Sequence, residues 1–186
     1  TDGFHLIQLI SSRDLRTWRR LGDRQAFIGP SRIGKGAYDL TQLLPPSAPL
    51  LRGDELWFYY TGLKYRTEPV KPEPGGGGAI CLAVLRRDGF VSLDAGEKLG
   101  TVTSKPFRWT GGKLYANVAT ETHGELRVEV LNSNGSVIDS SLPMTGNQPQ
   151  GEFRWKRNSI GSLNGETVSL RFSLQMASLY SYWVGE

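Results

Sequence analysis

A short aromatic run between two glycines constrains the fold of this chain more than any other segment. Between Gly53 and Gly62 the sequence reads Asp-Glu-Leu-Trp-Phe-Tyr-Tyr-Thr. Such a brief run of large apolar residues predicts a β-strand buried on both faces. A tight Arg-Gly-Asp turn at 52–54 joins it to an earlier strand that begins at Tyr38 and Asp39. A carboxylate at the mouth of a buried strand makes Asp39 the first candidate for a functional site.

Composition supports an all-β fold. The 186 residues include 23 glycines and 10 prolines, spread among short apolar runs, which favours turns and strands over helices. This length allows one large domain or two small ones. No apolar run approaches the roughly 20 residues that a membrane-spanning helix needs, so we expect no membrane partner. The chain begins at Thr1 without a signal-peptide pattern, and we expect that upstream sequence is missing.

The two parts of the chain differ in pattern, which predicts two domains at 1–99 and 100–186. In the first part a strand–turn–strand unit recurs with its turns at Asp14 and Asp88, as in the blades of a propeller. From Gly100 onward the strands alternate apolar and polar residues and are separated by turns, which predicts an antiparallel β-sandwich. The strands expected there cover 113–120, 125–131, 151–155, 167–174 and 178–184.

Several patterns argue against nucleic acid, nucleotide or metal. The net charge is +4, but the arginines are scattered along strand-type segments, which indicates solvated sheet faces. The stretch 29–36 is close to a phosphate-binding loop, yet Gly36 replaces its Ser or Thr and prolines follow where a helix should begin. His5 and His123 show no metal-ligand spacing. We therefore expect no cofactor and no nucleic-acid partner.

The single cysteine, Cys81, excludes an internal disulfide. It lies in the apolar run 79–85, which predicts a strand and a buried, inert thiol. Asn-Gly-Ser at 134–136 fits both a glycosylation acceptor and a hairpin turn, and we favour the turn. The stretch 68–78, with three prolines and four consecutive glycines, predicts an exposed loop.

Three stretches follow one another along the first part of the chain. They are Ser-Arg-Asp-Leu-Arg-Thr-Trp at 12–18, the stretch 38–62 from Tyr-Asp to Gly-Asp-Glu-Leu-Trp-Phe-Tyr-Tyr-Thr-Gly, and Arg-Arg-Asp-Gly-Phe-Val-Ser-Leu-Asp at 86–94. Together they resemble the last blades of five-bladed propeller glycoside hydrolases of the invertase and levanase type. The tail, at 126–135 and 154–182, resembles the β-sandwich that follows such propellers. The resemblance implies an ancestry in glycan hydrolysis and favours an extracellular or periplasmic location.

The same resemblance places the nucleophile and the acid of the family on early blades, which this chain does not contain. Hydrolysis of a glycosidic bond needs two carboxylates that flank the bond, and Asp39 has no evident partner acid in its own unit. We therefore expect the isolated chain to be inactive. Asp39, Tyr38 and Tyr60 are predicted to bind a sugar, and the alternative role for Asp39 is to cap the turn at Gly36.

A non-catalytic carbohydrate-binding or structural β module is the alternative function. Such modules bind sugars through exposed aromatic rings with polar neighbours. The candidate rings in the second part, most of which we expect in the core, are Trp109, Tyr115, Trp155, Tyr180, Tyr182 and Trp183. Because an incomplete propeller leaves open strand edges, we also expect either a partner segment from upstream or self-association through 4–10 and 38–44.

Overall fold

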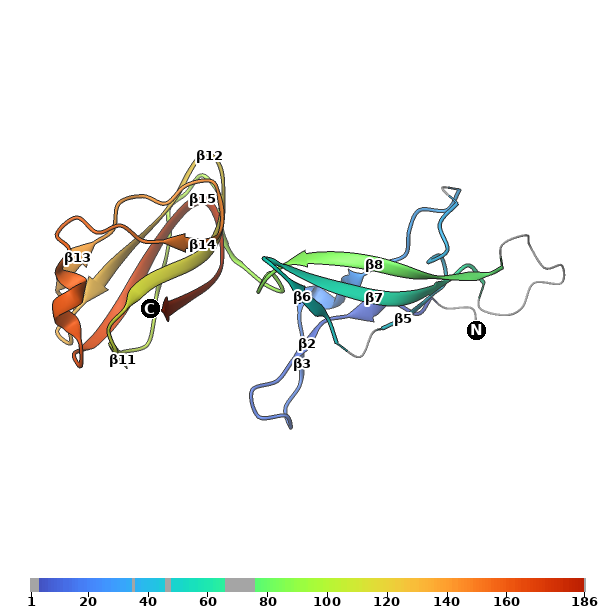
Figure 1. Cartoon of the computed structure of the whole chain (residues 1–186), viewed down its shortest axis with the longest axis horizontal. Helices are drawn as coiled ribbons and strands as arrows, with labels where there is room; N and C mark the ends of the chain where they lie inside the picture. Colours follow the sequence, from blue (N-terminus) through green and yellow to red (C-terminus); the bar gives the residue numbers. More distant parts are fainter. Residues whose placement is uncertain (1–3, 35, 46–47, 66–75, 186) are drawn as a thin grey trace. The chain divides into compact units, whose positions relative to one another are not determined.

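The structure, a computed structural model, describes residues 4–34, 36–45, 48–65 and 76–185. Strands and two short 3-10 turns make up its regular structure, which confirms the all-β class. The chain divides into two compact units, 1–85 and 86–186 (Figure 1). Within the described residues, no helix is long and apolar enough to cross a membrane.

The division between the units falls upstream of the expected boundary near Gly100. β9 (Leu93–Ala95) pairs with β15 of the second unit, at Leu179 to Ala177. The turn after Arg86 is present, with Asp88 at a φ of +56°. However, the strand expected at 90–93 does not continue a blade, because β9 hydrogen-bonds in the second unit instead.

β7 is the centre of the sheet in the first unit. β7 covers Glu55–Leu63. Its neighbours in the sheet are β5 (Gln42–Leu44), β6 (Leu50–Arg52) and β8 (Gly78–Arg86). β5 pairs with the end of β7 and β6 with its start, while β8 lies along the other side (Figure 1). The expected first strand is thus broken into β5 and β6, and Tyr38 and Asp39 precede it.

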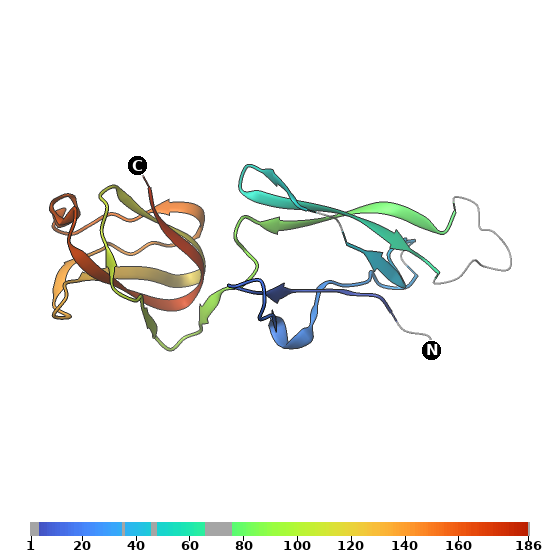
Figure 2. The ribbon, with the colours of Figure 1, turned by 90° about the horizontal axis from the view of Figure 1, so that it is seen from below.

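Only one face of β7 is buried, contrary to the expectation of burial on both. Phe58 and Tyr60 are buried, whereas Tyr59 between them is exposed. The reason is that a single layer covers the sheet (Figure 2). This layer is a hairpin formed by β1 (Ile7–Gln8), β2 (Ile10–Ser11), β3 (Arg19–Arg20) and β4 (Ala26–Ile28), with the 3-10 turn η1 at Gly22–Arg24.

The hairpin also occupies the segments that we expected to self-associate. The His5 N–H donates to the Thr41 carbonyl, and the Leu43 N–H donates to the His5 carbonyl, in a parallel bridge. The stretches 4–10 and 38–44 therefore meet at one bridge between His5 and Gln42, while β1 pairs with β4 and β5 pairs with β7. At the hairpin tip, Asp14 accepts hydrogen bonds from the N–H groups of Arg16 and Thr17, which closes the predicted turn. These bonds, the one from Thr17 first, lower the pKa of Asp14.

The second unit is organised around two antiparallel strands of 19 residues, β12 (Lys113–Leu131) and β15 (Thr167–Gly185). β12 also pairs with β13 (Val137–Ser140) and β14 (Asn147–Glu152). β15 also pairs with β9, β10 (Gly100–Thr103) and β11 (Phe107–Arg108). The 3-10 turn η2 covers Ser159–Leu163.

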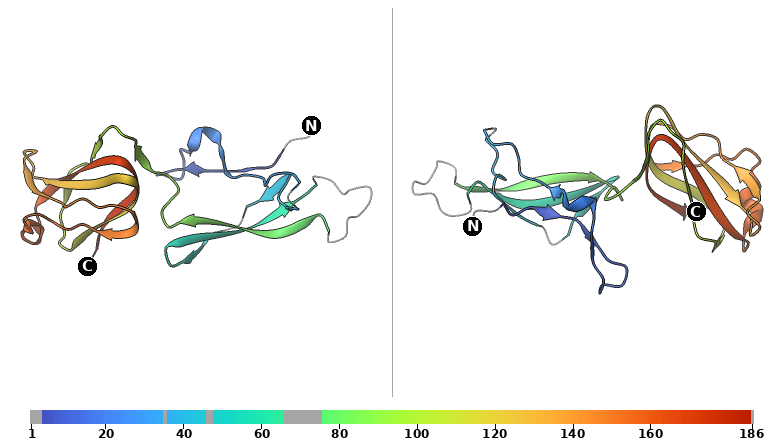
Figure 3. Two further views of the ribbon diagram at one scale, coloured as in Figure 1. Left: turned by 90° about the horizontal axis from the view of Figure 1, so that it is seen from above. Right: turned by 180° about the vertical axis from the view of Figure 1, so that it is seen from behind.

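Each long strand joins two strands that the sequence predicted as separate. The break in pattern between Thr120 and Glu125 is a register shift at a bend, where His123 has a φ of +66° and Met176, on the facing strand, a φ of +45°. Such irregularities bend a strand without ending it (Figure 3). As a result, apolar residues from both halves of β12 and β15, such as Leu114, Val128 and Leu170, meet in one core around Trp109 and Phe172.

Candidate functional site

Asp39 and Tyr60 form a buried polar cluster with Cys81 in the first unit. The Tyr60 hydroxyl donates a hydrogen bond of 2.7 Å to Asp39 Oδ2, and Asp39 is only 6% exposed. The period of two along β7 directs Tyr60 and Gly62 to the buried face, on which Cys81 of β8 also packs. A Cβ on Gly62 would lie 2.6 Å from Asp39 Cβ and 2.9 Å from Cys81 Sγ. The cluster therefore depends on glycine at 62.

The environment of this cluster favours the protonated forms of Tyr60 and Cys81. Burial raises the pKa of Tyr60, and the hydrogen bond to the Asp39 carboxylate and its charge raise it further. Burial also raises the pKa of the Cys81 thiol, with the charge of Asp39 as the second cause. Cys81 is half-buried rather than fully buried as predicted. A raised pKa disfavours the thiolate, which is the nucleophilic form of cysteine.

Tyr38, the third predicted sugar-binding residue, does not join this cluster. Its half-buried ring lies under the Lys64 ammonium, which is 4.6 Å from the ring centroid. Asp39 and Tyr60 are thus brought together, while Tyr38 makes a separate cation–π contact. Binding of a sugar by these three residues stays a prediction.

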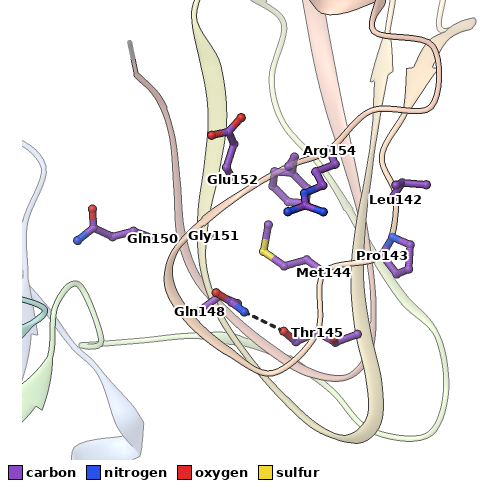
Figure 4. Close-up of a pocket in the computed structure, with 10 residues that line it drawn as sticks. Leu142, Pro143, Met144, Thr145, Gln148, Gln150, Gly151, Glu152 and Arg154 are labelled. Carbon is purple, nitrogen blue, oxygen red and sulfur yellow. Dashed lines mark hydrogen bonds between the residues drawn. The ribbon is translucent and has the colours of Figure 1, made fainter.

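A second group of polar side chains surrounds β14 in the second unit. One hollow beside this strand, the loop pocket, has a volume of about 760 Å³. It is lined by residues 142–145, by Gln148 and by residues 150–154. Figure 4 shows Met144 in its centre, and the Gln148 amide donates to the Thr145 carbonyl at 3.3 Å. Gln150 points away from Met144, to the other side of the loop (Figure 4).

Gln150 also lines a smaller hollow, the outer-face pocket, of about 250 Å³. The two hollows therefore adjoin at this side chain. The outer-face pocket is lined by Arg87, Asp88, Pro149, Gln150, Ser181, Tyr182 and Trp183. The Trp183 ring stacks on Tyr115, with ring centroids 5.6 Å apart and planes 14° apart. Aromatic surface and hydrogen-bonding groups thus share one concave site.

Two buried polar atoms beside the outer-face pocket have no hydrogen-bond partner among the described residues. They are Asn117 Oδ1 and Ser181 Oγ, whose residues face each other across β12 and β15. Asn117 is 1% exposed, and its amide nitrogen donates to the Arg87 carbonyl. Both atoms are enclosed, and a buried polar atom without a partner is energetically unfavourable.

The carboxylates of the described residues are dispersed. In five surface pockets that these residues form, the lining includes at most one carboxylate, namely Asp14, Asp88 or Glu152. No group of three or more His, Cys, Asp and Glu side chains there could hold a metal ion. Asp139 is buried, but it accepts hydrogen bonds from the N–H groups of Ser140, Arg157 and Ser159, which assigns it to holding the backbone.

Of the aromatic residues named from the sequence, Tyr115, Tyr182 and Trp183 lie at or behind the outer-face pocket, whereas Trp109 is fully buried. The sequence reasoning missed Gln150 and Ser181, which line the pocket, and Asn117, which lies beside it. The available signal was an asparagine in the middle of the apolar run Leu-Tyr-Ala-Asn-Val-Ala at 114–119. Fold and site together define an all-β protein with a mixed aromatic and polar pocket in its second unit.

No family model, curated protein or solved structure matches this chain.

Proposed function

We propose that this chain binds glycans without cleaving them, as the non-catalytic C-terminal part of a glycoside-hydrolase-like protein. The three stretches at 12–18, 38–62 and 86–94 support the relationship to propeller glycosidases. The observation that carries the binding role is the outer-face pocket, in which Trp183 and Tyr182 lie beside Gln150, Ser181 and Asp88.

The chemistry of this pocket matches a sugar ring. A sugar presents C–H groups on one face, which pack on an aromatic ring, and hydroxyl groups at its edge, which need donors and acceptors. Trp183, backed by Tyr115, supplies the aromatic surface. The Gln150 amide, the Asp88 carboxylate and the Arg87 guanidinium supply both kinds of hydrogen-bonding group.

The same pocket supports a role in binding without cleavage. An acid and a second carboxylate must flank the scissile bond, about 5 to 10 Å apart. Among the residues that the structure describes, Asp88 is the one carboxylate that lines the outer-face pocket, and Glu152 is the one that lines the loop pocket. One carboxylate can accept a hydrogen bond from a hydroxyl group, but it does not supply both catalytic roles.

Binding to soluble fructan, arabinan and xylan, measured by calorimetry and by affinity electrophoresis, tests this function. We expect at least one of them to bind. Trp183→Ala should weaken binding by about tenfold, because ring contacts contribute about 0.5–1.5 kcal/mol beyond area burial. Gln150→Ala should weaken it by about fivefold through the loss of one hydrogen bond of about 1 kcal/mol. Trp18→Ala, in the exposed hairpin of the other unit, is the matched control.

Three results would contradict glycan binding at the outer-face pocket, move the binding site to the first unit, or reveal cleavage. Equal affinity of the pocket variants and the control, or no binding of any glycan, would contradict the proposal. Loss of binding in Asp39→Ala alone would move the sugar site to the buried cluster of the first unit. Release of sugars from any of the three glycans by the purified chain, persisting in Asp39→Ala and Asp88→Asn, would refute the non-catalytic role.

A further inference from the structure

β8 is a long edge strand with an open side. It is nine residues long and pairs with β7, and among the described residues it pairs with no other strand. Alternate N–H and C=O groups of an edge strand point away from the sheet and can accept another strand. Figure 1 shows β8 on the side of β7 that is opposite β5 and β6.

The sequence of β8 does not protect this edge. It reads Gly-Ala-Ile-Cys-Leu-Ala-Val-Leu-Arg, without proline and with one charge, at its end. Proline, charges and bulges are the usual means by which proteins prevent strand addition. Moreover, Ile80, Leu82 and Val84 project from the face opposite the core and are 71%, 41% and 50% exposed. Tyr59 of β7 extends the same apolar face.

We propose that β8 is an interaction surface and that its partner is β8 of a second copy of this chain. Two copies related by a two-fold axis at Leu82 would pair antiparallel. Ile80 then lies opposite Val84, Leu82 opposite Leu82, and Gly78 opposite Arg86, by the antiparallel register. No like charges face each other in this arrangement, and the bulky Arg86 meets the residue without a side chain.

A two-fold contact of this kind also removes the open edge of β8. It joins the two sheets into one and pairs the open backbone of each β8 with the other, so no edge remains at this position. The other segments expected to self-associate, 4–10 and 38–44, are already paired within the chain. β8 is therefore the strand to which a second copy supplies backbone partners and, on the exposed face, lateral contacts between Ile80, Leu82 and Val84 and the same residues of the other copy.

Sedimentation of the full chain over a range of concentrations tests the association. We expect a monomer–dimer equilibrium, which Leu82→Lys weakens at least tenfold because it places two like charges opposite each other in the pair. Val137→Lys, at an equally exposed apolar position on β13 of the other unit, should leave the equilibrium unchanged. A wild-type chain that stays monomeric throughout the range would overturn the proposal.

Disulfide trapping tests the register and does not depend on the lysine variant. In a Cys81→Ala background, Leu82→Cys faces its own copy at a Cα distance of about 4.5–5.5 Å in an antiparallel pair, which suits a disulfide. We expect rapid cross-linking of this variant on mild oxidation. Ile80→Cys alone should cross-link poorly, whereas a mixture of Ile80→Cys and Val84→Cys should cross-link efficiently. A dimer that forms without trapping at position 82 would show that another surface is the interface, and would refute the proposal.

Discussion

At the scale of single residues, Gly62 shows how the absence of a side chain positions two others. Its Cα faces the backbone and Cβ of Asp39 and the sulfur of Cys81, so that the carboxylate reaches the hydroxyl of Tyr60. Its backbone φ is not in the left-handed region, so the requirement for glycine here is steric.

Gly62→Ala is therefore expected to destabilise the chain by about 1–3 kcal/mol, the usual result of forcing atoms into a packed core. The added methyl group meets backbone and Cβ atoms of Asp39, which do not rotate away. Urea denaturation measures the change. Gly29→Ala is the control, because its Cβ would meet Ala26 at an ordinary 3.5 Å. Equal stability of the two variants would contradict this steric role.

At the scale of elements, the 3-10 turn η2 packs against the core that the long strands of the second unit form. η2 carries Ile160 and Leu163 into the core, and its start is tied to β13 through Asp139. A buried carboxylate that accepts several backbone N–H groups fixes the position of a segment that has few bonds of its own.

Asp139→Ala should lower the free energy of unfolding by about 1–3 kcal/mol, because the part-buried N–H groups of Ser140, Arg157 and Ser159 lose their acceptor. We further expect faster amide exchange at Arg157 and Ser159 than elsewhere in the unit. Glu121→Ala, an exposed carboxylate on β12, serves as the control and should change stability little. Unchanged exchange at the two amides would show that Asp139 does not hold η2.

At the scale of the whole molecule, each unit has its own core. The core of the second unit, including Trp109, Phe172 and the partly buried Ala95, draws all of its members from residues 95–184. β9 contributes Ala95 and pairs with Ala177 to Leu179, although it precedes the boundary that the sequence predicted. The second unit therefore needs residues upstream of Gly100.

A fragment of residues 86–186 should fold cooperatively on its own, with a circular dichroism spectrum dominated by strand. A fragment of residues 100–186 should melt at a clearly lower temperature, because it lacks the β9 pairing and exposes the β15 edge at Ala177 to Leu179. Thermal denaturation of the two fragments side by side is the measurement. If both melted at the same temperature, the assignment of β9 to this unit would be wrong.

Alternation and turn chemistry are local, so the sequence predicts the all-β class, strands at 55–61 and 79–85, and turns at Asp14 and Gly53, which the structure confirms. The hydrogen bond of Tyr60 to Asp39, 21 residues away, the pairing of Asn117 with Ser181 and the addition of β9 to β15 are visible only in the folded chain. The physical reason is that any strand can offer the same backbone hydrogen bonds to any other. Which strands pair, and which polar atoms remain unpaired beneath them, follows from how the whole chain packs.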